Sequence, residues 1–186
     1  LAASGYVGFA VDMYGKGVLG SSLEENAQLM QPFMDNRLML QKRMQAALYA
    51  VKLMPWVDDS KVAAIGFCFG GLCSLDLART GADLKGVVSF HGLLGAPGNT
   101  QGNAVKAKIL ALHGHDDPIV PARQVLSFEQ EMTEAGADWQ LHIFGNTLHA
   151  FTNPAANNPD FGAVYHPDAD RRSWLAMENF LTEIFA

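Results

Sequence analysis

The residues of this chain that are best suited to covalent chemistry are a cysteine, an aspartate and a histidine. Cys68 stands between two glycines in the segment Gly-Phe-Cys-Phe-Gly. An acid follows, Asp116 or Asp117, and then His149. A thiol attacks as a thiolate, and it needs a base together with a group that orients the base. The order nucleophile, acid, histidine therefore predicts a triad for nucleophilic catalysis.

The segment around Cys68 is typical of a sharp turn between a strand and a helix, and the apolar run before it predicts the strand. We expect Gly66 and Gly70 to leave room for this turn and the backbone of Cys68 to be strained. Helix amides and the helix dipole would favour a thiolate there, and the amide of Phe69 can face a developing oxyanion. A small buried side chain is the alternative for Cys68, and we expect it for Cys73.

The remaining pattern predicts the elements that position these residues. Apolar, β-prone runs typical of buried strands cover residues 6–11, 62–67, 84–92, 107–114 and 138–144. Apolar residues at helical spacing predict helices over residues 34–54, 70–80, 121–136 and 168–185. Residues 18–33 are expected to be irregular. Asp168 or Asp170 is the expected N-cap of the last helix.

Strands that are apolar throughout and alternate with helices predict an α/β fold, with a mostly parallel sheet and helices on both faces. Ligand sites in such folds lie at the carboxyl ends of the strands. Cys68, Asp117 and His149 each follow an expected strand, so we expect them to meet at one edge of the sheet. Taken singly, turn formation before Pro118 also explains the aspartates, and a surface loop explains His149.

Length and composition narrow the classes of function. A chain of 186 residues with 49% apolar and 17% charged residues predicts a single globular domain, 1–186. The net charge of −6 and the absence of a basic run argue against nucleic acid and anionic membranes as partners. A small molecule is the expected ligand, and the protein is expected to be a monomer or a small homo-oligomer. Two cysteines are too few for a disulfide framework, which favours a cytoplasmic location.

Several motifs resemble those of one family. The segments GFCFGG, HGHDDPIVP and LHAF are similar to the dienelactone hydrolase family of α/β-hydrolases, and the resemblance runs from about Tyr6 to the C-terminus. It implies an α/β-hydrolase fold and a triad of Cys68, Asp117 and His149 that cleaves a carboxylic ester or lactone, as carboxymethylenebutenolidase does. Asp117 is the acid because it stands four residues before Pro121, as the family pattern D-x-x-V-P requires. No cofactor and no metal are implied.

The chain departs from the family pattern at two places. The family carries a glutamate and a second oxyanion amide on a strand and loop before the region that begins here at Leu1, so we expect the N-terminal strands to be lacking. The family also has an arginine at the position of Asn153, which holds the carboxylate of dienelactones. An ester or lactone is therefore a better expectation than dienelactone itself. Arg37 could supply a cation, although an exposed helix arginine is the plainer interpretation.

The sequence predicts the roles of three further residues less specifically. Phe67, His91 and Phe151 could line a substrate pocket, but aromatic residues beside such a turn also belong to cores, and His91 could be structural.

Two other functions remain open. His113, His115, Asp116 and Asp117 have the side chains for a metal-dependent hydrolase. The chain could also be a non-catalytic or redox-sensing domain in which Cys68 is a reactive thiol.

Overall fold

The computed structural model describes all residues, 1–186, which divide into two compact units, Leu1–Lys61 and Val62–Ala186. The single domain over residues 1–186 stays a prediction. No helix in the structure combines the length and the apolar character needed to cross a bilayer.

The first unit contains a short 3-10 helix and two α-helices. They are η1 (Ala2–Ser4), α1 (Leu23–Asp35) and α2 (Arg37–Lys52). Helix α2 confirms the predicted helix over residues 34–54. The prediction of irregular structure over residues 18–33 was wrong, because α1 occupies most of that range.

Helix α1 forms although Pro32 lies inside it. Its N-terminus carries a capping box, in which the Ser22 hydroxyl accepts from the amide of Glu25 at 3.1 Å. The Glu25 carboxylate in turn accepts from the amide of Ser21 at 2.8 Å. The bond from the Glu25 amide satisfies a donor that a helix leaves open at its start, and the bond from the Ser21 amide fixes the residue before the N-cap.

The strand predicted over residues 6–11 is not found, so this prediction was wrong. The segment belongs to neither sheet of the structure, and most of its side chains are exposed. An apolar run becomes a strand only when another strand pairs with it. The loop expected after it is present, since the Asp12 carboxylate accepts from the amides of Gly15 at 2.7 Å and Gly17 at 2.9 Å.

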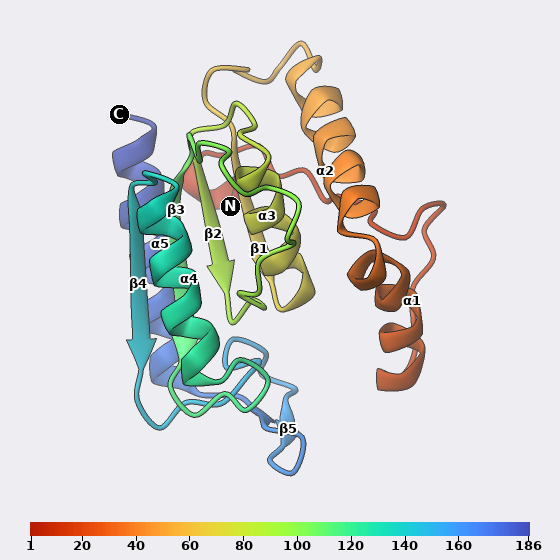
Figure 1. The fold of residues 1–186 in the computed structure, drawn as a ribbon, viewed down its shortest axis with the longest axis vertical. Helices are drawn as coiled ribbons and strands as arrows, with labels where there is room; N and C mark the ends of the chain where they lie inside the picture. The colour runs from red at the N-terminus through yellow and green to blue at the C-terminus, as the bar shows by residue number, and fades with distance from the viewer. The chain divides into compact units, whose positions relative to one another are not determined.

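The second unit is built around a parallel sheet (Figure 1). Its strands are β1 (Ala63–Phe67), β2 (Gly86–Phe90), β3 (Lys108–Gly114) and β4 (Trp139–Phe144), and their order in the sheet is the order in the sequence. Its helices are α3 (Phe69–Arg79), α4 (Ala122–Glu134) and α5 (Pro167–Ile184). All four strands run parallel, which confirms the α/β fold with a parallel sheet. A small antiparallel pair joins β5 (Asn157–Asn158) to β6 (Ala163–Val164).

Helices cover both faces of this sheet, as predicted. Neighbouring residues of a strand point to opposite faces. On β2, a Cβ at Gly86 would meet Phe180 and Ile184 of α5, whereas the hydroxyl of Ser89 faces Gly71 of α3. Figure 1 shows α4 in front of the sheet and α5 behind it.

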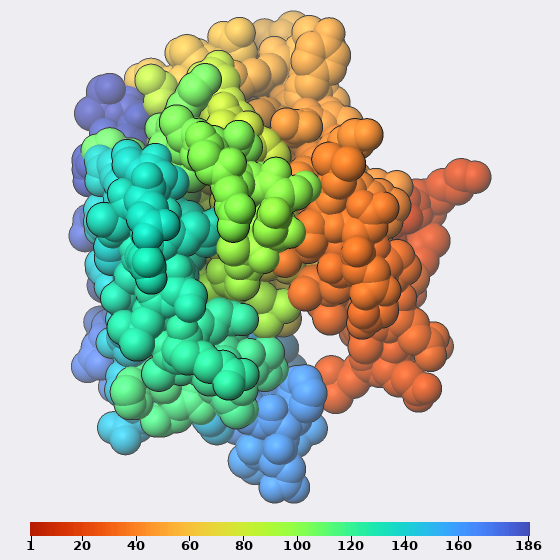
Figure 2. All heavy atoms as spheres, viewed as in Figure 1, coloured from red at the N-terminus to blue at the C-terminus, as the bar shows by residue number.

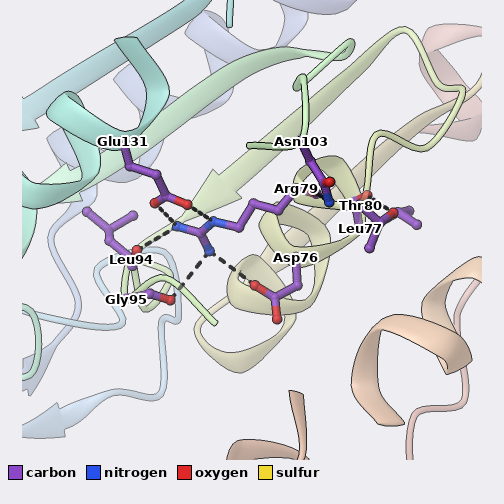
Figure 3. A network of polar contacts seen from close by, with 8 residues as sticks. All are labelled: Asp76, Leu77, Arg79, Thr80, Leu94, Gly95, Asn103 and Glu131. Atoms are coloured by element: carbon purple, nitrogen blue, oxygen red, sulfur yellow. Dashed lines mark hydrogen bonds and ion pairs between the residues drawn. The ribbon is translucent and has the colours of Figure 1, made fainter. Parts of the chain in front are cut away.

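A buried arginine joins α3 to α4. The guanidinium of Arg79, which is 1% exposed, pairs with Asp76 at 3.1 Å and with Glu131 of α4 at 2.8 Å. It also donates to the carbonyl of Leu94 at 2.8 Å and to that of Gly95 at 3.4 Å (Figure 3). Because the charge is paired and hydrogen-bonded, its burial is tolerated. The network fixes α3 relative to α4 and to the loop that follows β2.

The N-cap of α5 differs from the prediction. His166 is the cap, and its Nδ1 accepts from the amide of Ala169 at 3.3 Å. Asp168 and Asp170 lie within the first turn instead. Negative charge is favourable there because it faces the positive end of the helix dipole.

Candidate active site

Cys68 occupies the sharp turn that the sequence predicts. Strand β1 ends at Phe67 and α3 begins at Phe69, so Cys68 is the single residue between them. Its φ of 51° and ψ of −118° are strained for a residue with a side chain. A Cβ at Gly66 would overlap the carbonyl of Gly70, so the turn requires glycine at position 66.

The steric role predicted for Gly70 was wrong. A Cβ at this position would meet nothing within 4 Å, whereas a Cβ at Gly71 would lie 2.5 Å from the Ser89 hydroxyl and 2.8 Å from Cα of Gly92. Gly71 is therefore the second crowded glycine. It lets α3 approach the end of β2 closely, which places Cys68 beside that strand end.

Asp117 follows β3 and is held by two backbone amides. Its Oδ1 accepts from the amide of Ile119 at 2.9 Å and from that of Val120 at 3.3 Å. Burial raises the pKa of the Asp117 carboxyl, but the hydrogen bond and charge of His149 and the Ile119 amide outweigh it, so this pKa lies below its usual value. Asp117 is therefore an ionised acceptor with a fixed orientation.

His149 lies in the loop that follows β4, and its backbone is braced on both sides. Its amide donates to the carbonyl of Gly162 at 2.9 Å, and its carbonyl accepts from the amide of Val164 at 3.0 Å. The amide of Asp116 donates to the carbonyl of Thr147 at 3.0 Å, which ties the β4 loop to the β3 loop. These bonds bring residues from two strand ends together.

The two loops meet in a hydrogen bond between His149 and Asp117. Nδ1 of His149 lies 2.7 Å from Oδ2 of Asp117. Burial lowers the pKa of His149, but the bond to Asp117 and the nearby Cys68 side chain raise it more, to about 9. The imidazole therefore tends to keep its proton at neutral pH.

The Cys68 side chain acts on the His149 imidazole, although no hydrogen bond of good geometry joins the two side chains. Cys68 raises the pKa of His149, yet Nε2 of His149 has no hydrogen-bond partner of good geometry. A longer or less aligned thiol–imidazole contact accounts for both observations. Such contacts commonly tighten only when substrate binds.

The residues predicted to surround the site lie in different environments. Phe67 is 45% exposed beside Cys68, whereas Phe151 and His91 are buried, and the role of all three in a substrate pocket stays a prediction. Cys73 is buried, as predicted. Arg37, the first residue of α2, belongs to the first unit, so its role stays a prediction.

The segment proposed to hold a metal does not form a cluster of ligands. His113 and Asp117 are buried, while His115 and Asp116 are exposed. No group of three or more histidine, cysteine or carboxylate side chains in the structure is arranged to hold a metal ion. The metal-site interpretation of these four residues is therefore wrong.

Sequence reasoning missed Thr152, whose hydroxyl lies 2.8 Å from Nε2 of His91. The two residues follow different strands, and no motif in the sequence links them.

A cavity of about 580 Å³ lies apart from Cys68, Asp117 and His149. The segment 96–105 and helix α4 line it, and Figure 2 shows them side by side on one face of the unit. Its buried cation is Arg79, which is already paired with Asp76 and Glu131. We assign no chemistry to this cavity.

Comparisons with known proteins identify the family of this chain. Residues 1–185 match the model of the dienelactone hydrolase family. An uncharacterised protein of Caenorhabditis elegans is 40% identical over 154 residues, which are 79% of this chain and 95% of the relative. A relative from Aquifex aeolicus, provisionally named carboxymethylenebutenolidase, is 28% identical over 97% of this chain and 76% of its own length.

Among solved structures, a dienelactone hydrolase-like promiscuous phosphotriesterase from metagenomic libraries superimposes with a TM-score of 0.86. It is 40% identical, and the match covers 95% of this chain and 74% of that protein. The family match over nearly the whole chain and the shared fold lead to one conclusion. This chain belongs to the dienelactone hydrolase family of α/β-hydrolases.

Proposed function

We propose that this protein hydrolyses a carboxylic ester or lactone with Cys68 as the nucleophile, His149 as the proton carrier and Asp117 as its orienting acid. The observation that carries the proposal is the buried hydrogen bond of 2.7 Å between His149 and Asp117, with Cys68 close enough to raise the pKa of the imidazole. A buried pair in this arrangement keeps a proton on His149 and favours a thiolate beside it.

The first half-reaction forms an acyl-enzyme. The Cys68 thiolate attacks the carbonyl carbon, and the electron pair of the carbonyl moves to its oxygen. When the tetrahedral intermediate collapses, the bond to the alkoxy oxygen breaks, and the imidazolium of His149 donates its proton to that oxygen. His149 is then neutral, and the acyl group is joined to Cys68 as a thioester.

The second half-reaction releases the acid. Neutral His149 takes a proton from water while the water oxygen attacks the thioester carbonyl. The carbon–sulfur bond breaks, Cys68 leaves as a thiolate, and His149 remains protonated, so the starting state is restored. The Asp117 carboxylate stabilises each imidazolium state and remains ionised throughout.

The amide of Phe69 is the expected oxyanion donor. Phe69 begins α3 directly after Cys68, and amides at a helix start favour negative charge. Such a donor contributes only as charge develops on the carbonyl oxygen, so it lowers the barrier of both half-reactions.

The substrate class we propose is an ester or lactone without a carboxylate near the reacting carbonyl. Asn153 stands four residues after His149, and its Oδ1 accepts from the amide of Ala155 at 3.0 Å. Asn153 thus closes a turn and offers no positive charge to a substrate carboxylate. Dienelactone carries such a carboxylate and is therefore the poorer candidate.

The test compares Cys68→Ala with Cys73→Ala in hydrolysis of p-nitrophenyl acetate. We expect Cys68→Ala to lose activity on the order of a thousand-fold or more, since no nucleophile remains. Cys73 is buried in α3, so Cys73→Ala should keep kcat at a lower thermal stability. If Cys68→Ala keeps wild-type kcat, the proposal fails, and a thiol that reacts without turnover becomes the better account.

A second candidate activity is hydrolysis of phosphotriesters. This candidate is supported by the promiscuous phosphotriesterase, which is 40% identical to this chain in a match that covers 95% of this chain. The thiolate would attack phosphorus and expel the aryloxide, and water would then cleave the phosphorus–sulfur bond. Release of p-nitrophenol from diethyl p-nitrophenyl phosphate, lost in Cys68→Ala, would support this activity. Release at the uncatalysed rate would contradict it.

A further inference from the structure

The side chain of His91 lies against the imidazole of His149, although the two residues follow different strands. Their rings meet edge to face, with centroids 5.0 Å apart and an interplanar angle of 65°. The His91 ring also meets the Phe151 ring edge to face, with centroids 5.1 Å apart, and the Phe67 ring in a tilted arrangement, with centroids 6.1 Å apart. It therefore contacts both the residue before Cys68 and the segment 145–153 after β4, which we call the His149 loop.

The backbone of His91 is held by the sheet. Its amide donates to the carbonyl of Leu112 on β3 at 2.8 Å, and its φ of 37° is unusual for a residue with a side chain. A Cβ at the next residue, Gly92, would lie 3.0 Å from Cα of Gly71, so α3 packs tightly against this turn. The ring of His91 therefore projects from a rigid support.

One hydrogen bond joins this support to the His149 loop. Nε2 of His91 lies 2.8 Å from the hydroxyl of Thr152, which is three residues after His149. Nδ1 of His91 is buried and has no hydrogen-bond partner in the structure. Thr152 thus gives the His91 ring its one polar anchor.

The ring of His91 stays neutral. Burial and the charge of His149 lower the pKa of His91 to about 3. The other titratable groups that act on His149 are Asp117 and Cys68. Burial, together with the charge of His149, lowers the pKa of His113 on β3. A neutral His91 can pack against a protonated His149 without repelling it.

We propose that His91 is a positioning residue that holds the His149 imidazole between Asp117 and Cys68, by packing against its ring and by anchoring the His149 loop through Thr152. The effect on turnover rests on the proposed function. The effect on the position of His149 does not, because it follows from the contacts of His91 alone.

The first test compares Thr152→Val, which removes the hydroxyl, with Thr152→Ser, which keeps it. Loss of the partly buried hydrogen bond to His91 should lower kcat for p-nitrophenyl acetate on the order of ten-fold in Thr152→Val at nearly constant KM. Thr152→Ser should stay within about two-fold of the wild type, since the hydroxyl is retained. Thr182→Val is the matched control, because the hydroxyl of Thr182 donates to the carbonyl of Glu178 on an exposed part of α5.

The second test is an NMR titration of the His149 ring in the intact protein, and it decides the inference. A loosened imidazole pairs less well with Asp117 and Cys68, so the midpoint in Thr152→Val should fall below the midpoint measured for the wild type under the same conditions. His91→Phe keeps a ring but removes the hydrogen bond, so it should shift the midpoint in the same direction. This variant replaces Thr152→Val in the test if Thr152→Val does not fold. An unchanged midpoint in the folded variant overturns the inference, whatever happens to kcat, and so does an equal shift in Thr152→Ser.

The titration also separates this inference from the proposed function. If Cys68→Ala keeps wild-type ester hydrolysis, the proposed function fails, yet a lowered His149 midpoint in Thr152→Val still supports positioning by His91. If Cys68→Ala is inactive and the midpoint is unchanged, the proposed function stands and the positioning role is wrong.

Discussion

Nδ1 of His149 lies 2.7 Å from Oδ2 of Asp117, and neither side chain exposes more than 3% of its surface. The other carboxylate oxygen accepts two backbone amides, so the acid cannot turn away from the histidine. Water competes little with such a bond, which therefore sets both the orientation of the imidazole and its preference for the protonated form.

The first prediction concerns the choice between the two neighbouring aspartates. Asp117→Asn should lower kcat on the order of a thousand-fold, because a neutral amide neither stabilises the imidazolium nor fixes its tautomer. Asp116 is exposed, so Asp116→Asn should keep wild-type kcat. Steady-state hydrolysis of p-nitrophenyl acetate by both variants measures this difference. Equal losses in the two variants would contradict the assignment of Asp117.

The second prediction concerns stability and pH. Folding raises the pKa of His149 from 6.5 to about 9, so the folded state binds this proton more tightly than the unfolded chain. The resulting stability is fully present below about pH 6.5 and is lost as pH rises through about 9.

Urea unfolding of the wild type and of His149→Gln at several pH values measures this contribution. The excess free energy of unfolding of the wild type should be largest near pH 6 and shrink as the pH approaches 10. His142→Gln is the control, because His142 is an exposed residue of β4. An excess that stays constant across this range would show that His149 does not keep its proton through folding.

The third prediction concerns the glycines of the Cys68 turn. Gly66→Ala should destabilise the protein by roughly 3 kcal/mol or more, because the new methyl group overlaps the backbone carbonyl of Gly70. Gly70→Ala meets open space within α3 and should be neutral or stabilising by about 0.5–1 kcal/mol. Thermal unfolding distinguishes the two variants, and comparable destabilisation by both would refute this account of the turn.

The fourth prediction concerns the buried ion network between α3 and α4. Arg79→Met should destabilise the unit by about 3–5 kcal/mol, because the completely buried Asp76 loses its cation. Glu131 is 24% exposed, so Glu131→Gln should cost about 1 kcal/mol or less. Urea unfolding gives both values. A loss in Arg79→Met no larger than that in Glu131→Gln would contradict the importance of the pairing with Asp76.

Much of the second unit could be predicted from the sequence, because the patterns that indicate its strands and helices lie within short segments. Each strand of the sheet is a short apolar run bounded by turn residues, and the helices between them show helical spacing. Cys68, Asp117 and His149 could then be placed at strand ends without knowledge of any distance, since parallel strands end at one edge of a sheet.

Features that depend on a contact with another part of the chain could not be predicted in this way. The run 6–11 has the composition of a strand, but no other strand pairs with it. Helix α1 was missed because residues 18–33 have a mixed composition. The pair Ser22 and Glu25 matches the capping-box pattern and could have revealed the start of the helix.

The tight packing of Gly71 and the hydrogen bond that anchors the His149 loop also could not be predicted from the sequence. Gly71 needs its small size because Ser89 and Gly92, which are distant in the sequence, pack against it. The contact of His91 with Thr152 likewise joins the ends of two strands. Such contacts arise from the three-dimensional packing and leave no pattern in a single sequence.

The central claim is that the Cys68 sulfur carries the acyl group during turnover. Intact-protein and peptide mass spectrometry, after rapid acid quenching of a reaction with p-nitrophenyl acetate, tests it directly. The account predicts one acetyl group on the peptide that contains Cys68, present in Asp116→Asn and absent from Cys68→Ala. An active enzyme whose acetyl group is found on another residue, or formed equally in Cys68→Ala, would contradict it.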